Sequence, residues 1–211
     1  DKPVKMIWGV GKVMQASLEK AGIRTFADLL RWERSDLVTR YGSMGDRLWH
    51  LARGQDKRRI SAHEPVKSIS KETTFDVDTS DPEILDGHIW RLAEQVSDRA
   101  KAKSLAGRVV TLKLKRADHT SLTRRLALHG STQMADVVYR TAKNLFDQVG
   151  DQGPYRLIGC GLSHLMDANG SELAPDLLDS DAGKRSAAER ATDKIRERFG
   201  PNAIKKGRSL R

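Results

Sequence analysis

The sequence predicts an α+β fold, in which a small all-α domain precedes a β-α-β-β-α-β domain and a basic helical tail. Within residues 1–57 the apolar residues recur at helical spacing between short glycine turns. From Ser68 the period changes to two, and predicted strands and amphipathic helices alternate as far as Met166. The 211 residues carry a net charge of +10, which is typical of chains that bind an acidic partner. Nucleic acid is the first candidate for this partner, and an anionic membrane is the second.

The composition excludes several classes of protein. No apolar run approaches the length of a membrane span, so no membrane partner is expected. The segment Asp1–Val4 lacks the apolar stretch of a signal peptide. Cys160 is the single cysteine, which rules out an internal disulfide and predicts a reducing, cytoplasmic location. Gly159 and Gly161 flank it in an apolar run, so we expect a small core residue rather than a nucleophile.

The stretch Trp8-Gly9-Val10-Gly11-Lys12 predicts a site for phosphate groups. Its two glycines let the backbone turn tightly and approach another molecule closely. They lead into a predicted helix that ends near Gly22, and such a helix start exposes backbone N–H groups at the positive end of the helix dipole. Lys12 adds a charge there. The alternative is an ordinary turn before a core helix.

Three more short helices are predicted in this N-terminal domain, bounded by local capping signals and glycines. Thr25 and Asp28 have the layout of a capping box, and Ser35 is placed as an N-cap residue. The helices are predicted over Phe26–Trp32, Asp36–Tyr41 and Ser43–Gly54. Helices joined by a glycine-bearing hairpin form a helix-hairpin-helix unit, which strengthens the phosphate interpretation of Gly9 and Gly11.

Residues 68–166 are predicted to form a ferredoxin-like domain of order β-α-β-β-α-β. The alternating runs place strands from Ser68, around Val110–Leu114, around Leu122–Leu128 and over Pro154–Met166. One helix is predicted to begin at Asp81-Pro82, and the other is predicted to be capped by Ser131-Thr132.

Two predicted linkers separate this domain from its neighbours. Residues 58–67 are polar and basic without periodicity, and residues 167–185 are rich in Gly, Asp, Ser and Pro, which predicts a flexible segment. The tail, residues 186–211, is predicted to carry a helix over Ser186–Phe199 and a basic end. Four apolar residues of that helix are spaced four apart: Ala187, Ala191, Ile195 and Phe199.

The sheet face turned away from the two helices is predicted to be basic. By alternation it carries threonines and cations with almost no acid: Thr111, Lys113, Lys115, Thr123, Arg125 and, on this interpretation, Lys71. A solvated face is the alternative, but a face of one charge is better explained by a polyanion laid across it. Aromatic residues are scarce there, so contact with a duplex backbone is expected rather than base stacking.

Motifs for catalysis are absent from the sequence. It contains no Walker loop, no His-Glu-x-x-His, no Cys/His metal spacing and no nucleophile elbow. Asp76-Val77-Asp78 comes closest to paired carboxylates and is interpreted as a solvated turn after a strand. The chain is therefore predicted to bind, with no catalytic residue, metal or cofactor of its own.

Several segments of the chain resemble the Y-family translesion DNA polymerases, in particular the DinB type represented by bacterial DNA polymerase IV. The segments similar to the thumb of that family are Lys5–Gly11, Ala21–Leu30 and Leu51–Gly54. The segments similar to its little finger are Lys67–Phe75, Arg108–Lys115 with Ala117-Asp118, and Arg156–Leu165. Ile195–Gly200, with Ala203-Ile204 and Lys206-Gly207, resembles the C-terminal tail of many bacterial members. The similarity covers nearly the whole chain in the family's order.

The resemblance implies that the chain is a C-terminal fragment that binds primer–template DNA. The palm, with the carboxylates that hold Mg²⁺ for nucleotidyl transfer, would precede Asp1. The thumb hairpin would hold the primer backbone, and the little finger would lie along the duplex. Carried over by position, with the remaining residues of the sheet face, the DNA contacts are Gly9, Val10, Gly11, Lys12, Ser68, Ser70, Lys71, Thr111, Lys113, Lys115, Thr123, Arg125 and Arg156.

The chain departs from the family pattern at two places. The stretch 172–179 lacks the glutamine and the aromatic residue of a clamp-binding peptide, so Leu177-Leu178 would keep at most a weak contact with the sliding clamp. Arg116 replaces an expected aromatic residue. Two other functions stay open: a catalytically inactive Y-family-like accessory protein that recruits partners, and an RNA-binding helix-hairpin-helix protein.

Overall fold

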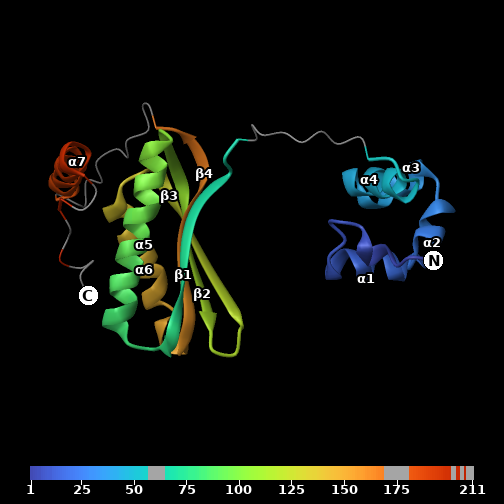
Figure 1. Ribbon diagram of the computed structural model, residues 1–211, viewed down its shortest axis with the longest axis horizontal. Coiled ribbons are helices and arrows are strands. Elements are labelled where there is room, and N and C mark those ends of the chain that lie inside the picture. Colours follow the sequence, from blue (N-terminus) through green and yellow to red (C-terminus); the bar gives the residue numbers. More distant parts are fainter. Residues whose placement is uncertain (57–64, 169–180, 201–202, 205–206, 208–211) are drawn as a thin grey trace. The chain divides into compact units, whose positions relative to one another are not determined.

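The computed structural model describes residues 1–56, 65–168, 181–200, 203–204 and 207 (Figure 1). The chain divides into two compact units, Asp1–Glu64 (unit 1) and Pro65–Arg211 (unit 2). Each unit has its own apolar core. Among the described residues, none of the helices is both long enough and apolar enough to cross a membrane.

Unit 1 is all-helical, as predicted. Its elements are the 3-10 turn η1 (Val4–Met6) and the helices α1 (Lys12–Lys20), α2 (Phe26–Leu30), α3 (Arg34–Tyr41) and α4 (Ser43–Ala52). The buried side chains that join them are Val4, Ile7, Val10, Leu18, Ile23, Leu29, Leu37 and Leu48. So small a core makes unit 1 sensitive to any loss of packing.

The local capping signals of unit 1 are confirmed in one case and wrong in another. Thr25 Oγ1 accepts from the Asp28 N–H at 3.2 Å, and Asp28 Oδ2 accepts from the Thr25 N–H at 2.9 Å, which is the predicted capping box. Helix α3 begins at Arg34, so Ser35 lies inside the helix and does not cap it. The start of α3 is exposed to water, which can satisfy its N–H groups without a side-chain cap.

Unit 2 has the predicted order of strands and helices. The elements are β1 (Ser68–Thr79), α5 (Pro82–Ala102), β2 (Leu105–Arg116), β3 (Ser121–Thr132), α6 (Ala135–Asp147), η2 (Gly150–Gln152), β4 (Tyr155–Asp167) and α7 (Ala182–Phe199). Strand β1 continues through Asp76–Asp78, so the predicted turn at these residues is wrong. Asp81 caps α5 by accepting from the Glu83 N–H at 2.8 Å.

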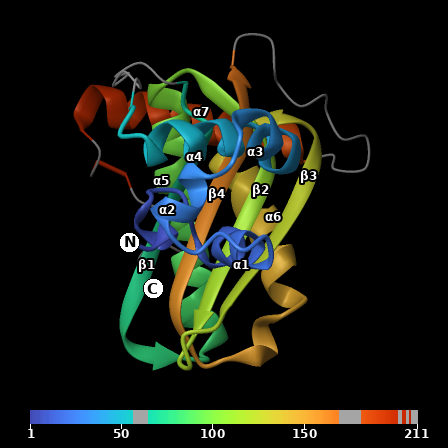
Figure 2. The ribbon, with the colours of Figure 1, turned by 90° about the vertical axis from the view of Figure 1, so that its right-hand side faces the viewer.

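The strand order of the sheet differs from the ferredoxin-like prediction. A ferredoxin-like sheet has its first and third strands in the middle, whereas here the order is β1-β4-β2-β3, antiparallel throughout (Figure 2). The distribution of apolar residues explains the difference. Strand β4 buries Ile158, Cys160 and Leu162 in the middle of the sheet, while β1 carries polar side chains on both faces, as an edge strand can.

Helices α5 and α6 cover one face of this sheet, and no helix among the described residues of unit 2 lies against the other face (Figure 1). The helix-covered face holds the core of the unit, including Leu85, Ile89, Val110, Leu112 and Ile158. Alternation along each strand then directs the remaining side chains to the open face.

Cys160 lies in this core, 3% exposed, as predicted for a small core residue. Burial raises the pKa of its thiol to about 12, so almost no thiolate forms at neutral pH. We expect the native chain to resist a thiol reagent such as Ellman's reagent and to react only when unit 2 unfolds. Labelling rates measured against urea concentration test this expectation. Rapid labelling without urea would contradict it.

Helix α7 packs against α5 and α6 through charged side chains. The Glu189 carboxylate, 3% exposed, accepts from the backbone N–H groups of Ala135 (2.8 Å) and Asp136 (3.1 Å). The Lys101 ammonium lies 2.7 Å from Glu189 and 2.6 Å from Asp193. Two further ion pairs flank this contact: Arg185–Asp136 at 2.8 Å and Arg196–Glu94 at 3.1 Å.

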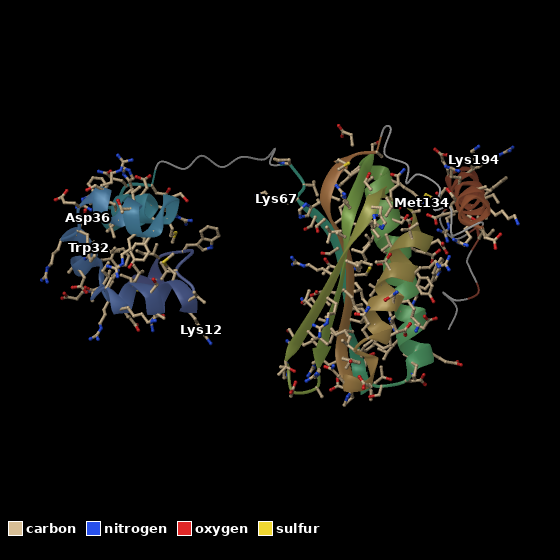
Figure 3. The ribbon with its side chains drawn as sticks, turned by 180° about the vertical axis from the view of Figure 1, so that it is seen from behind. Lys12, Trp32, Asp36, Lys67, Met134 and Lys194 are labelled. Atoms are coloured by element: carbon tan, nitrogen blue, oxygen red, sulfur yellow. The ribbon has the colours of Figure 1, made fainter. Side chains whose placement is uncertain are left out.

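Glu189 therefore takes the place that the sequence assigned to Ser131-Thr132. These two residues end β3, and α6 begins at Ala135 without a side-chain cap from its own N-cap residue, Met134. Figure 3 marks Met134 at this helix start, near the helix that carries Lys194. A carboxylate from another element supplies the missing acceptor and complements the helix dipole.

The apolar residues of α7 lie on its exposed side. Ala187 and Ala191 are exposed, as are Ile195 (38%) and Phe199 (67%). Polar contacts therefore hold the described part of α7 in place, which makes its packing dependent on charge.

Candidate nucleic-acid interface

The hairpin of unit 1 has the geometry expected of an anion site built from backbone groups. Gly9 has φ +99°, a conformation that strains any residue with a Cβ. Gly11 is the N-cap residue of α1, and the helix has neither a side-chain cap there nor an acidic residue in its first turn. Val10 is 8% exposed and its backbone N–H donates to the carbonyl oxygen of Ile7 at 2.9 Å, so neither its side chain nor its N–H is available to a phosphate. Lys12 stands at the N-terminal end of α1 (Figure 3).

Arg47 of α4 supports this hairpin, and sequence reasoning missed it. Its Nη2 donates to the carbonyl oxygen of Trp8 at 2.8 Å, and its guanidinium carbon lies 4.8 Å from the centre of the Trp8 ring. A Cβ on Gly9 would lie 3.4 Å from Arg47 Nη1. The partners are 39 residues apart in sequence, so no local pattern could have revealed the contact.

The strand register places the predicted sheet contacts in adjacent rows on the open face of unit 2. Thr111 pairs with Arg125, Lys113 with Thr123 and Lys115 with Ser121 between β2 and β3. Their neighbours Val110, Leu112 and Leu114 are buried against the helices, which fixes the open direction for the rows. On β4 the same rows continue through Gly161, Gly159 and Leu157, and on β1 through Ser70, Glu72 and Thr74.

The expectation that Lys71 shares this face is wrong. Lys71 pairs with Cys160, which pairs in turn with Leu112, and both of these residues are buried on the helix-covered side. Ser68 and Ser70 do lie on the open face, since they alternate with the buried Ile69. Lys71 occupies an edge strand, where a long side chain can reach water from the covered side.

Glu72 introduces an acid onto the face predicted to carry almost none. Its Oε2 lies 2.7 Å from Lys113 Nζ, and both side chains are partly open to solvent. An exposed ion pair of this kind contributes at most about 1 kcal/mol. A phosphate group could therefore compete with Glu72 for the Lys113 ammonium.

Arg156 lies at an irregularity near the start of β4. Lys115 pairs with Leu157 and Arg116 with Tyr155, so Arg156 is an extra residue between two paired ones. Its Nη1 lies 3.4 Å from His119 Nε2 in the turn between β2 and β3. Arg156 and His119 therefore lie together at one end of the sheet.

The fold of this chain is also present in a solved structure, a chimera of the Y-family DNA polymerases Dbh and Dpo4. The TM-score is 0.60 at 19% sequence identity, and the match covers 79% of this chain and 48% of the chimera. This likeness shows that the two proteins share a fold over part of their length.

The impB/mucB/samB family C-terminal domain matches residues 66–174, and the chain belongs to this family. DNA polymerase IV 1 of Mesorhizobium japonicum is 44% identical over 206 residues, 98% of this chain and 47% of the relative. DNA polymerase IV of Brucella melitensis is 44% identical over 207 residues, which are 98% of this chain and 46% of that relative. The chain spans about half the length of these curated relatives. The resemblance to the DinB type of Y-family polymerase is confirmed.

Proposed function

We propose that this chain is the thumb and little finger of an error-prone translesion DNA polymerase, and that it binds the backbone of primer–template DNA during lesion bypass. The rows of cations and hydroxyls on the open sheet face, Thr111–Arg125 and Lys113–Thr123, carry this proposal. The relatives named DNA polymerase IV support it.

The two units offer two kinds of phosphate contact. Lys113, Lys115 and Arg125 supply charge, and the threonines beside them supply hydroxyl donors to phosphate oxygens. The hairpin before α1 supplies backbone N–H groups at a helix start. Neither set reads base edges, so the binding is independent of sequence, as a polymerase that copies any template requires.

Nucleotidyl transfer is assigned to the palm of the whole polymerase, with Mg²⁺ held by carboxylates there. Within the ranges that the structure describes, no three His, Cys, Asp or Glu side chains gather into a metal-binding group. The weak sliding-clamp contact predicted at Leu177-Leu178 lies outside the described residues and stays a prediction.

The salt dependence of DNA binding tests the proposed function. If four to six cations neutralise phosphates, log K plotted against log salt concentration should have a slope of about −4 to −5. A fluorescence titration of the chain with labelled duplex DNA measures this slope. A slope near zero would rule out backbone binding, and a preference for duplex RNA in competition would favour the RNA-binding alternative.

Replacing Glu72 with glutamine should strengthen DNA binding. The change removes a negative charge from the open face and releases Lys113 from a 2.7 Å ion pair. We expect a several-fold tighter complex and a salt slope steeper by up to about 1. Glu83→Gln, on α5 rather than on the sheet, is the matched control. An unchanged affinity for Glu72→Gln would mean that DNA does not approach Lys113.

A further inference from the structure

Two large apolar side chains flank the glycine hairpin of unit 1 and are exposed. Trp8 is 76% exposed and Val13 is 87% exposed. The other three tryptophans are less exposed: Trp90 is buried, and Trp32 and Trp49 are partly buried against the core of unit 1. Exposure of a tryptophan in so small a unit marks a surface for contact with another molecule.

The Trp8 ring is held in position. The Arg47 guanidinium lies against the ring, 4.8 Å from its centre, and donates to the Trp8 carbonyl at 2.8 Å. A cation against an aromatic face is attractive, and the hydrogen bond fixes the backbone from which the ring projects. A side chain ordered in this way loses little conformational entropy when a ligand binds.

The surroundings of Trp8 are cationic. Gly9 and Gly11 expose backbone at the N-terminal end of α1, Lys12 begins that helix, and Arg47 lies under the ring. A nucleic-acid strand alternates charged phosphates with the apolar faces of sugars and bases, so it matches a cationic hairpin with apolar neighbours. An uncharged protein surface would leave these cations without a role.

We propose that Trp8, assisted by Val13, is an apolar DNA contact that packs against the sugar or base next to the phosphate held by the hairpin. This inference rests on the proposed DNA binding and deepens it. Apolar side chains make such contacts in the minor groove, and aromatic ones make them with exposed bases. The hairpin then has two functions: its backbone holds a phosphate, and Trp8 holds the neighbouring nucleoside.

The test compares Trp8→Ala with Lys12→Ala in titrations of the 211-residue chain with duplex DNA over a range of salt. Trp8→Ala should weaken binding about tenfold and leave the salt slope unchanged, because an apolar contact releases no counterions. Lys12→Ala should reduce the slope by about 0.9. Trp8→Phe should retain most of the affinity. Val38 is an exposed apolar residue of α3, and Val38→Ala should leave the affinity for DNA unchanged.

Fluorescence supplies a second measurement. The part of the emission lost in Trp8→Phe belongs to Trp8, and DNA should protect that part from quenching by acrylamide. Wild-type affinity in Trp8→Ala would overturn the proposal while DNA binding stands. A fall in slope equal to that of Lys12→Ala would also overturn it, because Trp8 would then act only by shaping the hairpin. If the wild-type chain does not bind DNA, the proposed function fails as well.

Discussion

Replacing Gly45 with alanine is expected to unfold unit 1 and leave unit 2 folded. Gly45 lies in α4 where it crosses α3, and a Cβ there would be 1.8 Å from the carbonyl oxygen of Leu37. The backbone of α3 cannot move aside as the end of a flexible side chain can. The two helices must therefore separate, which exposes Leu37 and Leu48. We expect a loss of at least about 3 kcal/mol, comparable to the whole stability of so small a core.

The two units have separate reporters for this experiment. Trp8, Trp32 and Trp49 lie in unit 1, so tryptophan emission reports mainly on that unit, whereas protection of Cys160 reports on unit 2. Gly183→Ala is the control, because a Cβ at that helical position meets nothing within 4 Å and alanine favours helix by up to about 1 kcal/mol. A Gly45→Ala chain with normal emission and melting would show that α3 and α4 need no such close approach.

Replacing Glu189 with glutamine or alanine is expected to release α7 from unit 2. The change removes the acceptor of the Ala135 and Asp136 N–H groups and leaves the Lys101 ammonium with one partner fewer. Breaking a buried ion pair costs about 3–5 kcal/mol when the remaining charge stays buried. Release of α7 lets water reach Lys101, so we expect a smaller loss, about 2 kcal/mol.

Hydrogen exchange at the amides of Ala135 and Asp136 measures this release directly, and urea unfolding measures the loss of stability. Glu197→Gln provides the matched control on the same helix, because Glu197 is exposed and should change stability by less than about 0.5 kcal/mol. If the two amides remain protected in the Glu189 variants, another group caps α6.

The packing of α7 should also weaken in acid. Burial raises the pKa of Glu189, but hydrogen bonds from Lys101 and from the Ala135 and Asp136 N–H groups outweigh burial, and the pKa is lowered. The stability from this carboxylate is therefore present above the unfolded pKa, about 4.3, and is lost as the pH falls through the lower folded value. Burial also lowers the pKa of Lys101, but its bonds to Asp193 and Glu189 outweigh this and raise it, so its contribution persists to strongly alkaline pH.

Asp98 opposes part of this trend, because burial raises the pKa of its carboxyl despite the nearby Arg196 and Lys101. A folded pKa above the unfolded one favours the folded state as the group takes up its proton. Exchange rates of the Ala135 amide measured from pH 7 to pH 3, after correction for the intrinsic rate, should show release of α7 only at the acidic end. Release that begins near neutrality would contradict the lowered pKa of Glu189.

The sequence predicted features that depend on neighbours within a few residues. The capping box of Thr25 and Asp28, the start of α5 at Asp81-Pro82 and the open-face positions of Lys113 and Arg125 all follow from local spacing. The misplacement of Lys71 is instructive, because it alternates with Ser70 and Glu72 and shares the side of Ile69. Strict use of alternation would have placed Glu72, not Lys71, on the open face.

The sequence alone predicted the all-α unit, the β-α-β-β-α-β unit, the glycine hairpin and most of the basic sheet face. These features depend on periodicity and on turn residues, which are set by neighbours close in the sequence. Only the tertiary structure decided which strands lie in the middle, which carboxylate caps α6, and that Arg47 holds Trp8. Glu189 lies 54 residues from Ala135, and Arg47 lies 39 from Trp8. Such pairings form when packed units bring distant residues together, and no local pattern specifies them.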